Sequence, residues 1–194
     1  MIRFLIGFLT AVVLVLLALF CYVRFGFVDP RADVQPGSLE KKLAMPALDA
    51  SVDRRAPSTK NPLQPTEENL LGGMKIYQQA CAGCHGDIVH PHTDFGDSFY
   101  PRVPQFVEDA PDMPENQNYY IIQHGVRLSG MPGWKSSLKD SEIWQVTTFL
   151  SSIDKLPPQV LAAWKAAATE PGTAGSADAG AKTETKDKQM EMSH

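Results

Sequence analysis

Cys81-Ala82-Gly83-Cys84-His85 is the most informative segment of this sequence. Two thiols stand three positions apart, and a histidine follows the second thiol directly. A lone Cys-x-x-Cys pair occurs in redox-active disulfides and as half of a zinc site. With the added histidine, the pattern is that of c-type haem attachment. Each thiol can then form a thioether to one haem vinyl group, and the histidine is placed under the iron.

The alternatives explain fewer of these residues. A zinc site lacks a second cysteine pair, because the third cysteine, Cys21, lies in a long apolar run. A thiol-redox site gives His85 no role and expects a βαβ context that the sequence does not show. We therefore expect one covalent haem c bound by Cys81 and Cys84, with His85 as an iron ligand.

The N-terminus carries the longest apolar run. Phe4 to Val23 contains no charged residue and is bracketed by Arg3 and Arg24. As a helix, such a run spans the roughly 30 Å of a bilayer core. A cleaved signal peptide has a shorter apolar core, about 7–15 residues, and a small-x-small cleavage site, which is missing here. Residues 1–23 are predicted to be an uncleaved transmembrane anchor.

Composition divides the rest of the chain into three parts. Residues 24–65 carry six prolines and keep no helical or strand period for more than a turn or two, which predicts an extended tether with a short helix near 38–43. Residues 170–194 have no periodic apolar face, and we expect a disordered tail. The folded domain is then 66–169.

Apolar periodicity in this domain predicts an all-α fold. One helix starts near Thr66, and others are expected at about 116–125, 141–153 and 157–168. Asp140 is the expected N-cap of the helix at 141–153. The residues expected to face the core are Leu70, Met74, Tyr77, Tyr119, Ile122, Ile143, Val146, Leu150 and Ile153.

Charge and cysteine content exclude two broad classes. The 194 residues carry a net charge of −4, which argues against nucleic-acid binding. Three cysteines are too few for a disulfide scaffold. Two local groups of polar residues could be interpreted as functional sites, but a structural role on the surface explains each of them. The carboxylates at 108–115 are expected to form a solvated patch rather than acid–base machinery, and His90-Pro91-His92 a solvent-exposed loop rather than a metal site.

These motifs resemble the class I c-type cytochromes, in particular the small membrane-anchored bacterial ones, over residues 66–156. The resemblance implies the class I cytochrome c fold around a single haem. In that family a glycine and an aromatic residue precede the first haem cysteine by eight and four positions, which correspond to Gly73 and Tyr77 here. The glycine lets the first and last helices cross closely, and Trp144 and Phe149 are expected near it.

The same resemblance suggests the second axial ligand. Residues 126–134 are similar to the family's methionine loop, in which Pro follows Met and an aromatic residue comes soon after; Met131 is therefore the expected ligand. Met113, in an acidic segment, is the alternative. The family's proline carbonyl that orients the axial histidine corresponds to Pro101 or Pro104. Candidates for contact with the haem propionates are Arg102, Arg127 and Trp134.

The implied function is one-electron transfer rather than catalysis. Haem attachment takes place outside the bacterial inner membrane, so the resemblance implies a haem domain anchored on the periplasmic side. Its expected partners are redox proteins, namely a quinol-oxidising complex, a terminal oxidase or a periplasmic dehydrogenase. Two alternatives stay open: a permanent electron-transfer subunit of a respiratory complex, and a haem sensor or peroxidase.

Overall fold

The computed structural model describes residues 1–27 and 29–169, and all regular structure in these ranges is helical. The predicted all-α fold class is therefore confirmed. The tail predicted at 170–194 lies outside the described residues. The chain divides into two units, Met1–Val34 and a second unit that begins at Gln35.

The first unit contains helix α1, Ile2–Arg24, which has no buried residue. Among the described residues, this helix alone is long and apolar enough to cross a membrane. Its length and composition are compatible with a membrane anchor.

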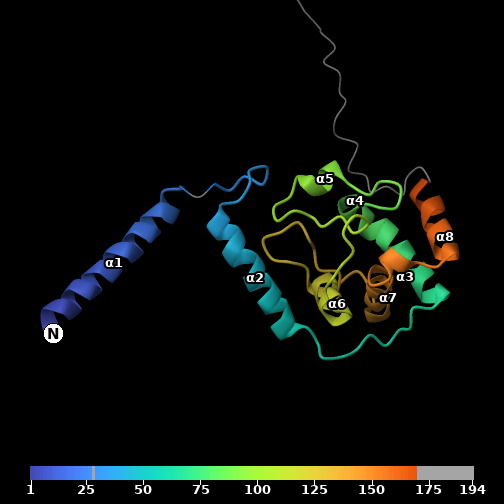
Figure 1. Cartoon of the computed structure of the whole chain (residues 1–194), viewed down its shortest axis with the longest axis horizontal. Coiled ribbons are helices and arrows are strands. Elements are labelled where there is room, and N and C mark those ends of the chain that lie inside the picture. Colours follow the sequence, from blue (N-terminus) through green and yellow to red (C-terminus); the bar gives the residue numbers. More distant parts are fainter. Residues whose placement is uncertain (28, 170–194) are drawn as a thin grey trace, which may run out of the picture. The chain divides into compact units, whose positions relative to one another are not determined.

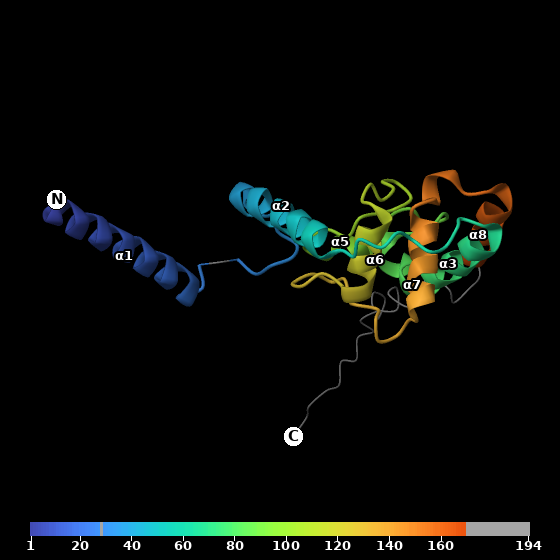
Figure 2. The same ribbon diagram turned by 90° about the horizontal axis from the view of Figure 1, so that it is seen from below.

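The second unit is a cluster of helices (Figure 1). Its helices are α2 (Ser38–Arg55), α3 (Glu67–Ala80), α4 (Ala82–His85), α5 (Asp94–Asp97), α6 (Glu115–His124), α7 (Asp140–Leu150), the 3-10 helix η1 (Ile153–Lys155) and α8 (Pro158–Thr169). In both views α7 lies between α6 and α3, and α8 packs on α3 (Figures 1 and 2).

The core agrees closely with the apolar pattern. The predicted inward residues are all buried except Ile153, which is half-buried and packs against them. Trp164 and Val160 of α8 add a further buried layer, with 1% and 0% exposure. Burial of these apolar side chains on one face of each helix stabilises the bundle.

The start of α3 agrees with the prediction, and the start of α7 differs from it. The Thr66 hydroxyl accepts a hydrogen bond from the backbone N–H of Asn69 at 3.3 Å, which caps α3. Gly125 ends α6 with φ of 70°, a backbone conformation suited to glycine. The prediction of Asp140 as the N-cap of α7 is wrong, because the cap is Lys139. Asp140 instead accepts a hydrogen bond from the hydroxyl of Tyr119 on α6.

The segment predicted as an extended tether contains a longer helix than expected. The sequence predicts a short helix near 38–43, whereas α2 runs from Ser38 to Arg55 and packs against α6 (Figures 1 and 2). Val52 is buried, and Gln117 of α6 donates a hydrogen bond to the Asp53 carboxylate at 3.1 Å. A neighbouring helix supplies these contacts, so local periodicity does not reveal them.

The chain between α2 and α3 is also attached to the bundle. The Asn116 amide donates to the Pro57 carbonyl at 2.8 Å, and the Asn61 amide donates to the Thr148 hydroxyl at 2.8 Å. Side chains of α6 and α7 thereby hold both ends of residues 57–61.

Candidate functional site

The two cysteines lie where α3 ends and the one-turn helix α4 begins. Cys81 and Cys84 are half-buried and form no disulfide. The backbone N–H of His85 donates to the Cys81 carbonyl at 3.0 Å, which folds the segment into a turn. Burial raises the pKa of Cys81 to about 12 and also raises that of Cys84. Both therefore stay protonated thiols at neutral pH, unlike the low-pKa cysteines of thiol-redox sites.

His85 is buried, and a hydrogen bond and a ring stack fix the orientation of its imidazole. Its Nδ1 lies 2.9 Å from the Pro104 carbonyl oxygen. Because a carbonyl only accepts, Nδ1 carries the proton, and Nε2 keeps its lone pair. The ring stacks on Phe106 with centroids 4.4 Å apart. Burial lowers the pKa of His85, which favours the neutral imidazole that binds iron. Of the two prolines left open by the sequence, the structure selects Pro104.

Gly73 and Tyr77 fix the position of α3, the helix that precedes the Cys81–His85 segment. A Cβ at Gly73 would lie 2.2 Å from the Gln145 carbonyl oxygen, so α3 and α7 approach at a distance that only glycine permits. The hydroxyl of Tyr77 donates to the Gly86 carbonyl at 2.7 Å. Phe149 lies beside Gly73 as expected. Trp144 faces the other way and stacks on Tyr119 of α6 at 4.0 Å.

A further clamp holds the carbonyl of Cys84, and sequence reasoning did not find it. This oxygen accepts from the Thr93 hydroxyl at 2.9 Å and from the Gln105 amide at 3.0 Å. The Gln105 side-chain oxygen accepts in turn from the Thr93 backbone N–H at 3.1 Å. A single Thr or Gln has no sequence pattern that predicts a hydrogen bond to the Cys84 carbonyl. The contact forms only because the folded chain brings Thr93 and Gln105 back beside Cys84.

Met131 lies in a closed loop between α6 and α7. The Val126 N–H donates to the Met131 carbonyl at 3.1 Å, and the Met131 N–H donates to the Ser129 hydroxyl at 3.1 Å. Met131 is half-buried and packs against the core. Leu128 has φ of 60° at the tip of the loop. The alternative, Met113, is also half-buried and precedes α6, where its carbonyl accepts from Asn118 at 3.1 Å.

The residues considered for haem-propionate contacts and for a metal site differ in their exposure and contacts. Arg102 and Arg127 are exposed, whereas Trp134 is half-buried and packs against the core. His92 contacts two carboxylates, with Nε2 at 2.8 Å from Asp97 and Nδ1 at 3.6 Å from Glu108. In the described ranges, no group of three His, Cys, Asp or Glu side chains is arranged to hold a metal ion. His90 and His92 are exposed, and each lies beside a carboxylate, Asp87 and Asp97 respectively.

The donor set of the Cys81–His85 segment fits covalent haem. It offers two protonated thiols on one turn and an imidazole whose Nε2 lone pair is fixed by the Pro104 hydrogen bond and the Phe106 stack. Such hydrogen bonding to the second ring nitrogen is typical of metal-binding histidines.

Comparison with known proteins agrees with this chemistry. Residues 68–150 match the model of the family described as cytochrome c oxidase, cbb3-type, subunit III. These residues form a class I c-type cytochrome domain. The cofactor of this cytochrome domain is covalently bound haem c, and its activity is electron transfer.

Two individual proteins are similar to part of this chain. A nicotinate dehydrogenase subunit of Pseudomonas putida is 32% identical over 91 residues, which cover 44% of this chain and 7% of that much longer protein. A chain of a reducing HAO-like protein complex of Kuenenia stuttgartiensis aligns at 24% identity with a TM-score of 0.41, over 50% of each chain.

Proposed function

We propose that this protein is a membrane-tethered one-electron carrier whose haem c is attached to Cys81 and Cys84, with His85 and Met131 as axial ligands. The observation that carries the proposal is the arrangement around His85. Its Nδ1 donates to Pro104 and its ring stacks on Phe106, so the Nε2 lone pair has a fixed direction. A ligand held in this way needs little reorganisation when the charge of the site changes.

When bound, haem c supplies an iron that accepts and releases one electron, and its potential depends on the axial ligands. The protein's part is to hold those ligands in both states. The Cys84 carbonyl clamp and the Tyr77 hydroxyl fix the two ends of the His85 turn. A methionine ligand raises the reduction potential of a c-type haem, which suits transfer to an oxidase or from a dehydrogenase.

Met131 is favoured over Met113 by its setting. It lies in a loop whose backbone hydrogen bonds are internal and which packs against the core. Met113 lies between exposed Asp112 and half-buried Glu115, in a more polar segment that is less suited to a buried thioether.

Helix α1 supports the proposed tethering. An anchor of this kind keeps the haem domain at high effective concentration near membrane partners. The matching family is described as an oxidase subunit, and the Pseudomonas relative is part of a dehydrogenase. These names support redox enzymes as partners, with the domain either a shuttle or a permanently bound component. We propose the periplasmic side of the bacterial inner membrane as its location, because c-type haem is attached on that side.

The test of the axial ligands compares two methionine variants. Oxidised wild type is expected to show the weak far-red sulfur-to-iron charge-transfer band of Met-ligated haem. Met131→Ala should abolish this band, lower the midpoint potential through loss of the thioether, and allow carbon monoxide to bind. Met113→Ala is the matched control and should leave all three properties unchanged. The reverse pattern would assign the ligand to Met113, and a wild type without the band would favour a haem sensor or bis-His ligation.

A further inference from the structure

A buried carboxylate lies two residues after the proposed iron ligand His85. Asp87 is 3% exposed. Its Oδ1 accepts from the backbone N–H groups of Val89 at 2.8 Å and His90 at 2.7 Å, and its Oδ2 accepts from the Gln78 amide at 3.2 Å. All three partners are donors, so the site favours a group that only accepts. That group is the ionised carboxylate.

Gln78 is oriented for this contact by a residue from the far end of the domain. Gln78 is 3% exposed, and its Oε1 accepts from the indole N–H of Trp164 at 2.9 Å. Because the Gln78 amide oxygen accepts the hydrogen bond from the Trp164 indole N–H, the Gln78 NH₂ group points toward Asp87. Trp164 is itself fixed by edge-on packing against Tyr77 and Phe149.

These two hydrogen bonds link α8, through Gln78 of α3, to Asp87. Trp164 lies beyond residues 68–150, the part of the chain that matches the family model. Residues 78 and 87 lie within it. The orientation of Gln78 thus depends on a helix outside the matched segment.

We propose that Asp87 is a potential-setting residue, a buried negative charge that stabilises the oxidised haem iron, and that Gln78 and Trp164 are positioning residues that keep this charge in place. The inference rests on the proposed attachment and ligation at Cys81, Cys84 and His85. The oxidised centre carries one more positive charge than the reduced centre. A fixed negative charge nearby, shielded from water, favours the oxidised form and lowers the reduction potential.

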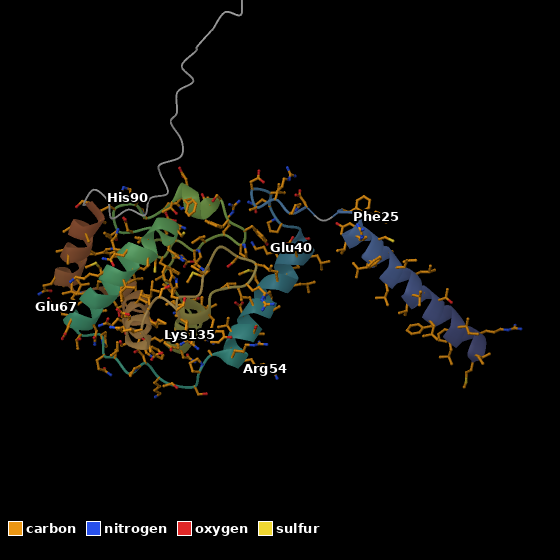
Figure 3. All side chains as sticks on the ribbon, turned by 180° about the vertical axis from the view of Figure 1, so that it is seen from behind. Phe25, Glu40, Arg54, Glu67, His90 and Lys135 are labelled. Atoms are coloured by element: carbon orange, nitrogen blue, oxygen red, sulfur yellow. The ribbon has the colours of Figure 1, made fainter. Side chains whose placement is uncertain are left out.

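One exposed histidine lies beside the Asp87 carboxylate. His90 Nδ1 lies 3.4 Å from Asp87 Oδ1, and the His90 side chain is 61% exposed; Figure 3 labels His90. Water weakens the effect of a charge at this exposed position without abolishing it, whereas the Asp87 side chain is 4% exposed. The Asp87 carboxylate is therefore the less screened of the two groups.

Asp87→Asn tests the charge with little change of shape. The oxygen of the new amide can still accept from the Val89 and His90 N–H groups, but its nitrogen would face the Gln78 amide nitrogen. The double variant Asp87→Asn/Gln78→Glu removes that conflict. The introduced asparagine then donates to the introduced glutamate, which also accepts from Trp164, and the negative charge returns to the same buried cluster.

The experiment is a redox titration of the full-length haem protein in detergent, with the charge-transfer band and thermal unfolding recorded for each variant. Asp87→Asn should raise the ratio of reduced to oxidised protein at a fixed solution potential on the order of tenfold, because a charge that is shielded from water is weakly screened. This corresponds to about 59 mV for a one-electron couple. The double variant should return the potential toward that of wild type.

Asp97→Asn is the matched control. It removes the same charge from the surface of the same segment, where the Asp97 side chain is 53% exposed, and should change the ratio less than about twofold. An unchanged potential in Asp87→Asn with an intact band would overturn the proposal, as would equal shifts in Asp87→Asn and Asp97→Asn.

Two further outcomes are informative. If Asp87→Asn accumulates no haem protein, His90→Lys places a permanent positive charge beside Asp87 from the surface. It should then raise the potential more than His92→Lys does, and equal shifts would contradict the proposal. A wild type without covalent haem or without the charge-transfer band would instead count against the proposed function, which separates the two failures.

Discussion

Gly73 is the residue on which the close crossing of α3 and α7 depends. We predict that Gly73→Ala destabilises the domain, because the new Cβ would lie 2.2 Å from the Gln145 carbonyl oxygen and 2.8 Å from the Phe149 Cβ. Backbone cannot move aside as a side chain can, so the helices must separate. The free energy of unfolding should fall by about 1–3 kcal/mol or more. Thermal and denaturant unfolding followed by circular dichroism measure this loss.

Gly72 provides the matched control. A Cβ there would meet only the flexible end of the Gln145 side chain, at 3.0 Å from Nε2. Gly72→Ala should therefore be close to neutral or slightly stabilising, since alanine favours the helix. If both alanine variants unfold at the same temperature, the crossing does not require glycine at position 73.

His92 is expected to give the domain a small pH-dependent contribution to stability. Hydrogen bonding and charge from Asp97, aided by Glu108, raise the pKa of His92 above its ordinary 6.5. A group with a raised folded-state pKa stabilises the fold fully below the unfolded pKa, and this contribution is lost as the pH rises through the folded pKa. His92→Gln should therefore lower the unfolding temperature below about pH 6.5 and have no effect well above the raised pKa.

Salt is the check on this interpretation. The His92 contacts are exposed, so the difference between wild type and His92→Gln at low pH should shrink when salt is added. A difference that is constant across pH would instead show that His92 acts through packing.

At the scale of elements, α2 is predicted to be a docked part of the haem domain rather than free tether. Val52 is 4% exposed, and α2 packs against α6. Val52→Ala should lower the free energy of unfolding by about 1–2 kcal/mol, the cost of removing two buried carbon groups. Denaturant unfolding of the haem protein measures it.

The same helix contains its own control. Leu43 is 63% exposed, so Leu43→Ala should change the free energy of unfolding by no more than about 0.5 kcal/mol. Equal and small effects of both substitutions would mean that α2 is not docked in solution. Arg54 and Glu40 mark the two ends of α2 (Figure 3).

At the scale of the whole molecule, the proposed anchor is expected to be separable from the redox chemistry. Replacing residues 1–24 by a cleavable secretion signal should yield a soluble cytochrome with the haem spectrum and midpoint potential of the full chain. The physical reason is that α1 belongs to a different unit from the haem segment. Spectroscopy and redox titration of the secreted protein test this.

A deletion that continues through residue 56 is the contrasting variant. It removes α2, exposes the surface of α6 that α2 covers, and takes away the Asp53 carboxylate that accepts from Gln117. This variant should unfold at a lower temperature than the shorter deletion. A changed spectrum or potential in the shorter deletion would show that the N-terminal unit contacts the haem domain.

Local patterns in the sequence were sufficient for much of this protein. The periodic apolar residues of α3, α6 and α7 predicted helices and buried faces, because a 3.6-residue period exposes one stripe to the core whatever the helix packs against. The Cys81–His85 motif predicted the cofactor, because thioether spacing is set by five consecutive residues. The role of Gly73 was implied by the resemblance to class I c-type cytochromes, and the structure shows the close contact that requires glycine there. The assignment of Met131 to the iron remains a prediction.

Only the tertiary structure decided the contacts between distant segments. It selected Pro104 over Pro101 for His85, docked α2 on α6, and turned Trp144 toward Tyr119. It also joined Trp164 to Gln78 across 86 positions of sequence, and Gln78 to Asp87. Single polar residues such as Gln78 and Gln105 have no period and no local signature. Their hydrogen-bond partners come from segments that are distant in the sequence. Packing of the whole domain, rather than any local pattern, brings those segments together.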